Sequence, residues 1–178
     1  MPKGNLIGAE GKGFKIAMGG LDGGRLSIGA CSLGAGRAAL ECASEYATER
    51  KQFGKAISSN QSLAFKLANM AAELHSARLV LRHAAAAMDA LKGQNPENSP
   101  AGTWPGGQEA VTVACAMAKL KATDAGFAVC NDALQIHGGY GYLNDYPVER
   151  MLRDVRVHQI LEGTNEIMQH IISRAIMK

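Results

Sequence analysis

The sequence has 178 residues, of which 47% are hydrophobic and 20% are charged. This length and apolar content are enough for one domain with a sizeable core. Lysine and arginine number 19 against 16 aspartates and glutamates, and the charges are scattered along the chain. Such a balance excludes a strongly basic surface, so we expect neither nucleic acid nor a membrane surface as a partner.

No apolar run is long enough to cross a bilayer, and the first residues, MPKGNLIGAEGKG, lack the apolar core of a secretion signal. We therefore predict a soluble, non-secreted protein of a reducing compartment. Its cysteines stand in alanine-rich segments, without a Cys-x-x-Cys pair or histidines at metal-ligand spacing. This setting predicts small buried thiols, with no disulfide and no metal site, at Cys31, Cys42, Cys115 and Cys130.

Residues that favour helix dominate the long segments, and aromatic residues make up only 5% of the chain. We therefore predict an all-α fold, an antiparallel four-helix bundle with short extra helices. In chain order, the apolar periodicity predicts helices over residues 11–19, 23–49, 60–91, 107–137, 146–155 and 164–177.

Two breaks between these helices are rich in residues that end helices. Residues 50–60, RKQFGKAISSN, hold a glycine and serines and predict a loop. Residues 92–108 are dense in proline and glycine, and their length predicts a mobile loop or an insertion with a separate role. Residues 29–37, GACSLGAGR, lack the lysine of a phosphate loop, so we expect their glycines to let helices pack closely.

The segment QIHGGYGYLNDYP, residues 135–147, holds three glycines within four residues. A long apolar helix ends there at Gly138, as expected of a glycine in the left-handed conformation. One glycine would be enough to end the helix, so the others indicate either a backbone that something approaches closely or a tight structural turn. The residues alone leave both interpretations open.

The segment HQILEGTNEIM, residues 158–168, places a carboxylate just before the last helix. Thr164 is the predicted N-cap of that helix, which leaves Glu162 outside it. Glu162 follows the apolar pair Ile160 and Leu161 and precedes Gly163, which allows a sharp turn. A solvated acid near a helix cap is the simpler interpretation, and a functional acid is the alternative.

Four stretches together resemble the C-terminal domain of the acyl-CoA dehydrogenases: LDGGR, ERKQFGKAISSNQ, QIHGGYGY and YPVERMLRDVRVHQILEGTNEIM. The resemblance covers nearly the whole chain apart from residues 92–108 and is closest to the isobutyryl-CoA and other short, branched-chain members. It implies that residues 1–178 are one helical-bundle domain of an enzyme whose N-terminal helical domain and middle β-domain are not in this sequence. We therefore expect the 178 residues alone to bind FAD poorly and to be weakly active or inactive.

The resemblance implies FAD-dependent α,β-dehydrogenation of a short or branched acyl-CoA to a 2-enoyl-CoA, with Glu162 as the base that removes the α-proton. Some members carry the base at the position of Gly24, which has no side chain here. Because the α-proton of a thioester is weakly acidic, the base needs a desolvated site and a stabilised enolate. Ile160 and Leu161 offer an apolar flank, and Gly163 leaves room for the substrate. Electrons would pass from the reduced FAD to an electron-transferring flavoprotein.

The other motifs imply further contacts. Asp22 and Arg25 match residues that contact the acyl-CoA, although an i,i+3 surface ion pair is the alternative. The segment beginning at Arg50 matches one that reaches the FAD of a neighbouring subunit. Glu166 stands where several members have glutamine. The expected FAD contacts are Arg50, Lys51, Gln52, Phe53, Asn60, Gln61, Gln135, His137, Gly138, Gly139, Thr164, Asn165 and Glu166.

The resemblance also implies a homo-oligomer, a dimer or a tetramer, located in the bacterial cytoplasm or the mitochondrial matrix. Two other classes of function stay open at this point: a non-catalytic helical scaffold used in assembly, and a nucleic-acid-binding relative, against which the balanced charge argues. An acyl-CoA oxidase is a third alternative, close to the dehydrogenases themselves.

Overall fold

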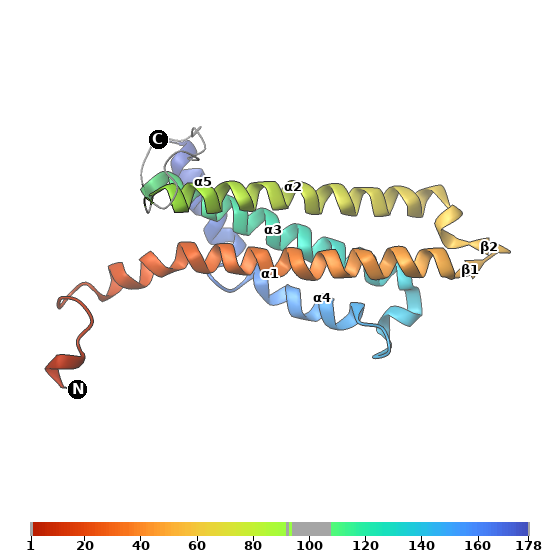
Figure 1. The fold of residues 1–178 in the computed structure, drawn as a ribbon, viewed down its shortest axis with the longest axis horizontal. Helices are drawn as coiled ribbons and strands as arrows, with labels where there is room; N and C mark the ends of the chain where they lie inside the picture. Colours follow the sequence, from red (N-terminus) through yellow and green to blue (C-terminus); the bar gives the residue numbers. More distant parts are fainter. Residues whose placement is uncertain (1, 92, 94–107, 178) are drawn as a thin grey trace.

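The computed structural model describes residues 2–91, 93 and 108–177. Three long helices lie side by side, and successive ones run in opposite directions (Figure 1). They are α1 (Gly13–Glu49), α2 (Gln61–Leu91) and α3 (Gln108–His137), and α3 contacts both of the others. The predicted all-α fold is confirmed for the described residues.

Two shorter helices complete the bundle. Helix α4 (Val148–Arg156) runs along α1 and α3 as the short fourth member, and α5 (Asn165–Ile176) packs on α3 and crosses the bundle near the end of α2 (Figure 1). A short 3-10 helix, η1 (Lys3–Asn5), precedes α1. Three others lie in connections between helices: η2 (Ile57–Ser59), η4 (Gly138–Tyr142) and η5 (Val157–Gln159).

The predicted loop at residues 50–60 holds a small antiparallel hairpin that the sequence analysis missed. Strands β1 (Lys51–Gln52) and β2 (Lys55–Ala56) pair with Lys51 opposite Ala56. The two residues of its turn, Phe53 and Gly54, both have positive φ, at 52° and 80°. A two-residue turn of this kind fits the twist of a hairpin, but Phe-Gly is not the usual Asn-Gly or Asp-Gly signature.

The predicted break between helices 11–19 and 23–49 is wrong, because α1 is continuous from Gly13 to Glu49. A glycine inside a helix costs about 1 kcal/mol relative to alanine but does not remove a hydrogen bond, as proline does. Packing from Asp22 onward carries the helix through its glycines, since Leu26 and Leu33 are buried. The predicted loop or insertion at 92–108 falls outside the described residues except at Gly93 and Gln108.

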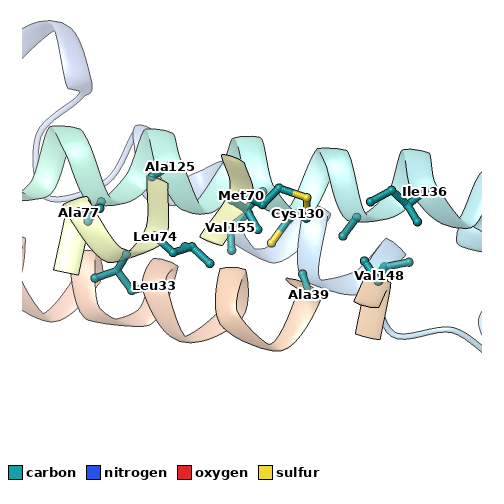
Figure 2. Close-up of a cluster of buried hydrophobic side chains, with 14 of the residues drawn as sticks. Leu33, Ala39, Met70, Leu74, Ala77, Ala125, Cys130, Ile136, Val148 and Val155 are labelled. Atoms are coloured by element: carbon teal, nitrogen blue, oxygen red, sulfur yellow. The ribbon is translucent and has the colours of Figure 1, made fainter. Parts of the chain in front are cut away.

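The core runs along the shared faces of α1, α2 and α3. Ala39, Ala43 and Ala47 of α1 are fully buried, and larger side chains such as Met70 and Leu74 fill the space between the helices. Figure 2 shows this cluster, which α4 closes with Val148 and Val155. The small residues on α1 keep the interhelical distance short.

Helices α1 and α3 approach most closely where glycine meets serine. A Cβ atom on Gly126 would lie 2.7 Å from the carbonyl oxygen of Ser32 and 2.9 Å from its Cβ. A Cβ on Gly36 would lie 3.4 Å from the Cα of Gly126. The prediction that the glycines of 29–37 permit close packing is confirmed at Gly29 and Gly36, whereas Gly34 has no such neighbour and is exposed.

The cysteines are all free, and the prediction of buried thiols holds for Cys115 and Cys130. Burial raises the pKa of the Cys130 thiol to about 12, which makes it unreactive. The prediction is wrong for Cys31, which lies on the outer face of α1, and Cys42 is only half-buried. Within the described ranges no cluster could hold a metal ion, and no helix there is both long and apolar enough to span a bilayer.

We expect Gly126→Ala to lower the free energy of unfolding by about 1–3 kcal/mol, because its methyl group would overlap the backbone of Ser32. Gly34→Ala is the matched control, since nothing lies within 4 Å of its added methyl group. It should stabilise the helix by about 0.5–1 kcal/mol. Urea unfolding followed by circular dichroism measures both changes, and equal effects at the two positions would contradict the close contact.

Candidate active site

Glu162 lies in the connector between η5 and α5, and its backbone is in the left-handed region. Its φ is 57°, and that of the following Gly163 is 91°. A non-glycine residue in this region costs about 1–2 kcal/mol, so surrounding contacts must hold it there. The sharp turn expected at Gly163 is present, and it begins one residue earlier than the sequence indicates.

The carboxylate of Glu162 lies against Gly24 of α1. A Cβ on Gly24 would be 2.6 Å from the carboxyl carbon and 2.9 Å from Oε1, and Oε2 would be closer still. The side chain of Glu162 therefore occupies the space that a side chain at position 24 would need. Position 162, which carries the expected base, and position 24, where some family members carry theirs, are therefore neighbours in space.

Asp22 and Arg25 form an ion pair one turn apart on α1, with 2.8 Å between Arg25 Nη1 and Asp22 Oδ1. Thr112 of α3 donates a second hydrogen bond to Asp22, 2.8 Å from its Oδ2. The expected i,i+3 pair is present, but it is buried, because each residue is only 6% exposed. Within the described part of the chain, Arg25 Nε is buried and has no hydrogen-bond partner, which costs about 1–3 kcal/mol.

The first turn of α5 carries two capping groups. Thr164 is the N-cap, as predicted, and its Oγ1 accepts from the backbone N–H of Ile167 at 3.4 Å. Glu166 is exposed, and its carboxyl accepts hydrogen bonds from the backbone N–H of Glu166 itself and from the Thr164 hydroxyl. These bonds lower the pKa of the carboxyl. This negative charge suits the positive end of the helix dipole. Glu166 is thus engaged within its own helix end.

Asn165 points inward and joins α5 to α3. Its Nδ2 donates to Thr123 Oγ1 at 3.1 Å and to Asp124 Oδ1 at 2.7 Å. Its Oδ1 accepts from Nζ of Lys119 at 2.8 Å, and the same ammonium group donates to the carbonyl oxygen of Gly163 at 2.8 Å. This polar network lies directly behind the Glu162 connector.

The sequence analysis did not single out Lys119, although a signal was available. Lys119 is fully buried, and burial lowers the pKa of its ammonium group. In ACAMAKLKATD the neighbours three or four residues away on the same helix face include Cys115, Ala116 and Ala122, which are small and apolar, so a lysine facing the same way was a candidate buried charge.

A second contact ties η5 to α1. His158 Nδ1 lies 2.8 Å from the hydroxyl of Ser32, which is fully buried. Burial lowers the pKa of this histidine, which favours the neutral ring. Gln159 adds a bond to Asp124 of α3, with 2.6 Å between Nε2 and Oδ1. The segment before Glu162 is therefore held by hydrogen bonds to both α1 and α3.

The glycine turn lies near the other end of the bundle. Helix α3 ends at His137, and Gly138 has a φ of 59°, as predicted for a helix stop. Gly141 is required by packing, because a Cβ there would lie 2.8 Å from the carbonyl oxygen of Leu134. A Cβ on Gly139 would meet nothing within 4 Å, so that glycine leaves an open backbone surface.

A cavity of about 430 Å³ opens beside this turn. The ring of His137 stacks on Tyr46 with 4.4 Å between centroids, and the guanidinium of Arg50 lies 5.1 Å from the centre of the Tyr140 ring. These contacts fix the wall of the cavity. Five of the residues expected to contact FAD line it: Arg50, Gln52, His137, Gly138 and Gly139.

The remaining expected residues surround this end more loosely. Phe53 is fully exposed at the tip of the hairpin, and Lys51 is exposed on β1. Asn60 caps α2, since its Oδ1 accepts from the backbone N–H of Ser62 at 3.1 Å. Gln61 and Gln135 are exposed on their helices.

The two groups of residues are far apart on one helix. Gly24 and Arg50 are both positions of the α1 region, and 26 residues of helix span roughly 39 Å. The structure therefore divides the expected site residues into two groups, one around Glu162 and one around the glycine turn. A larger cavity of about 550 Å³ between α2 and α3 contains none of them.

These features define a helical-bundle domain in which the two groups of expected site residues lie at well-separated points along its longest helix. The family model described as acyl-CoA dehydrogenase, C-terminal domain, matches residues 11–177, and the chain belongs to this family. The predicted membership is confirmed.

Three known proteins illustrate the similarity. Mitochondrial isobutyryl-CoA dehydrogenase from Bos taurus is 49% identical over the whole chain. Subunit CarC of the caffeyl-CoA reductase-Etf complex from Acetobacterium woodii is 43% identical over the whole chain. The structure of an acyl-CoA dehydrogenase complexed with FAD from Bacillus anthracis superposes with a TM-score of 0.86 over 99% of this chain, at 30% identity. The chain spans 39% and 42% of the two curated relatives and 31% of the third protein.

We expect the stabilising effect of the Glu166 carboxylate to depend on pH. Its pKa is lower in the folded chain than the ordinary 4.5, so the charged form stabilises the fold above that pH and the effect is lost as the pH falls through the folded-state value. Glu166→Gln should therefore lower the free energy of unfolding at pH 7 and make progressively less difference in acid. Urea titrations across this range measure it, with Glu41→Gln on the exposed face of α1 as the charge control. A difference that grows in acid would contradict the capping role.

Proposed function

We propose that the chain is the base-bearing and flavin-sharing bundle of an FAD-dependent acyl-CoA dehydrogenase, which converts a short or branched acyl-CoA to a 2-enoyl-CoA. One observation carries the proposal: the Glu162 carboxylate is held against Gly24, next to the buried Arg25, in a chain that matches the family over residues 11–177. A solvated acid near a helix cap would not need a strained backbone or a cleared space on the neighbouring helix.

The proposed chemistry at this end is a proton transfer. The C–H bond at the α-carbon of the thioester breaks, Glu162 Oε2 takes the proton, and the electron pair stays on the substrate as an enolate. The backbone N–H of Glu162 would donate to the enolate oxygen, where negative charge develops. Bound FAD would supply the chemistry that removes the β-hydrogen as a hydride.

The residues at the glycine turn fit a dinucleotide. The guanidinium of Arg50 can pair with a diphosphate, and the open backbone at Gly139 lets a planar group approach closely. Phe53, fully exposed on its hairpin, can pack on a cofactor ring. The presence of FAD in the Bacillus anthracis relative supports the same assignment.

If both groups of residues serve a flavin as we propose, each group is one half-site, and more than one copy of the chain is needed. One FAD cannot reach both Gly24 and Arg50, roughly 39 Å apart along α1, so each flavin would be shared between the base end of one copy and the glycine turn of its neighbour. We therefore propose a dimer or a tetramer in which the bundles bring opposite ends together.

We propose that electrons leave through an electron-transferring flavoprotein, and the name of the CarC relative, which is a subunit of a reductase-Etf complex, supports such a partner. The same name favours a second direction, in which a 2-enoyl thioester is reduced and Glu162 returns the proton to the α-carbon. We propose a bacterial cytoplasmic or mitochondrial matrix location, in keeping with the mitochondrial relative.

We expect Glu162→Gln to slow flavin reduction by at least about a hundredfold, because the base that removes the α-proton is lost. The measurement uses the natural polypeptide that carries this chain, with FAD, mixed anaerobically with isobutyryl-CoA or butyryl-CoA while the visible flavin band is followed. Gly24→Ala should also slow it, because the methyl group displaces the carboxylate, whereas Gly23→Ala should not. Glu41→Gln controls for lost charge, and bleaching at the normal rate in Glu162→Gln would sink the proposal.

Mixed oligomers test whether the flavin site is shared. Glu162→Gln and Arg50→Glu should each be inactive alone, because each spoils one half of every site. When the two variants are co-expressed, some sites combine the intact base of one copy with the intact Arg50 of the other, so activity should return. Each variant co-expressed with itself is the control. A mixture as inactive as its components would show that both half-sites do not serve one flavin.

A further inference from the structure

Lys119 stands out because its ammonium group is fully buried and yet is not part of the proposed chemistry. Burying an ammonium group is unfavourable unless hydrogen bonds replace its water. Here two acceptors do so at 2.8 Å, the carbonyl oxygen of Gly163 and Oδ1 of Asn165. An unbranched apolar side chain such as methionine would fill the same space without that penalty. Lysine at this place therefore suits a role that packing alone does not supply.

The two bonds from Lys119 act on the residues that determine where Glu162 points. Gly163 directly follows Glu162, and both have positive φ. Fixing the Gly163 carbonyl fixes the peptide plane between Gly163 and Thr164, one residue beyond the base, while Asn165 fixes the start of α5. On the N-terminal side, the backbone N–H of Leu161 is already held by the carbonyl of Val157 at 3.0 Å.

We propose that Lys119 is a positioning residue for the base: through Gly163 and Asn165 it holds the connector in the left-handed turn that places the Glu162 carboxylate against Gly24. This inference rests on the proposed function of Glu162. Without the ammonium group, the Gly163 carbonyl loses its donor and the connector relaxes toward negative φ. The carboxylate then leaves the face of α1, and a displacement of about 1 Å in such a group is enough to cost a hundredfold in rate.

The charges around Lys119 agree with this role. Asp124 of α3, Glu162 of the connector and Glu166 of α5 favour its charged form, whereas burial and Arg25 of α1 oppose it. Helices α3 and α5 are also joined by hydrogen bonds that do not involve Lys119, since Asn165 donates to Thr123 and Asp124. Loss of the Lys119 bonds should therefore loosen the connector more than it loosens the bundle.

The test compares Lys119→Met with Lys119→Arg in the FAD-loaded natural polypeptide, with isobutyryl-CoA or butyryl-CoA as the probe. We expect Lys119→Met to lower kcat by about tenfold to a hundredfold with KM changed by less than about threefold. Lys119→Arg keeps the charge and the donors and should recover a measurable part of the loss. Lys121→Met is the matched control, since Lys121 lies two residues further along α3 and only pairs with Glu73 at the surface.

A second measurement, hydrogen–deuterium exchange, does not depend on catalysis. Hydrogen–deuterium exchange at residues 160–166 should become faster in Lys119→Met and stay unchanged in Lys121→Met, while exchange in α1 and α2 stays the same in both. If Lys119→Met does not fold, Lys119→Gln, which keeps a neutral donor, replaces it in both measurements.

The outcomes separate this inference from the proposed function. A kcat within about twofold of the parent, or exchange that rises equally over the whole bundle, overturns the positioning role and leaves a purely structural lysine. A parent protein that does not reduce flavin with either thioester, and is unchanged by Glu162→Gln, overturns the proposed function instead. In that case exchange at residues 160–166 still decides whether Lys119 holds the connector.

Discussion

The close contact between α1 and α3 is the constraint on which the rest of the domain depends. Where Gly126 meets Ser32, no room is left for a side chain, and the two backbones touch. Two helical turns away from this contact lie Lys119 on α3 and Gly24 on α1. Because the helices are already close, the connector between η5 and α5 reaches both: the Glu162 carboxylate lies against Gly24 of α1, and the Gly163 carbonyl accepts from Lys119 of α3.

Stability and strain are distributed unevenly along the bundle. The middle is alanine, leucine and valine packed in ordinary helices. The base end concentrates features that oppose folding: a non-glycine residue with positive φ, a buried ion pair, a buried ammonium group and an unpaired guanidinium N–H. Such features persist only when surrounding structure over-determines them, and they gather at functional sites. The alanine-rich middle offsets their cost.

Local signals were enough to predict much of the structure from the sequence. The long helices, the Thr164 cap and the helix stop at Gly138 depend on neighbouring residues, and all are found. The continuity of α1 was not predicted, because its glycines indicate a helix break when the packing of the helix on its neighbours is not known. The Lys119 bonds were missed for another reason, since Lys119 and Gly163 are 44 residues apart. The contact between Gly24 and Glu162 likewise depends on how the helices assemble, so it cannot be predicted from either local motif.

Helix α1 also sets the distance between the two half-sites. It is one unbroken element that begins before Gly24 and ends next to Arg50, so the separation and the relative rotation of the two half-sites are set by its residue count alone. One inserted residue between them would lengthen the helix by about 1.5 Å and turn one half-site by about 100° relative to the other. The length of this helix is thus restricted by the proposed function, a form of constraint that acts on spacing rather than on side-chain identity.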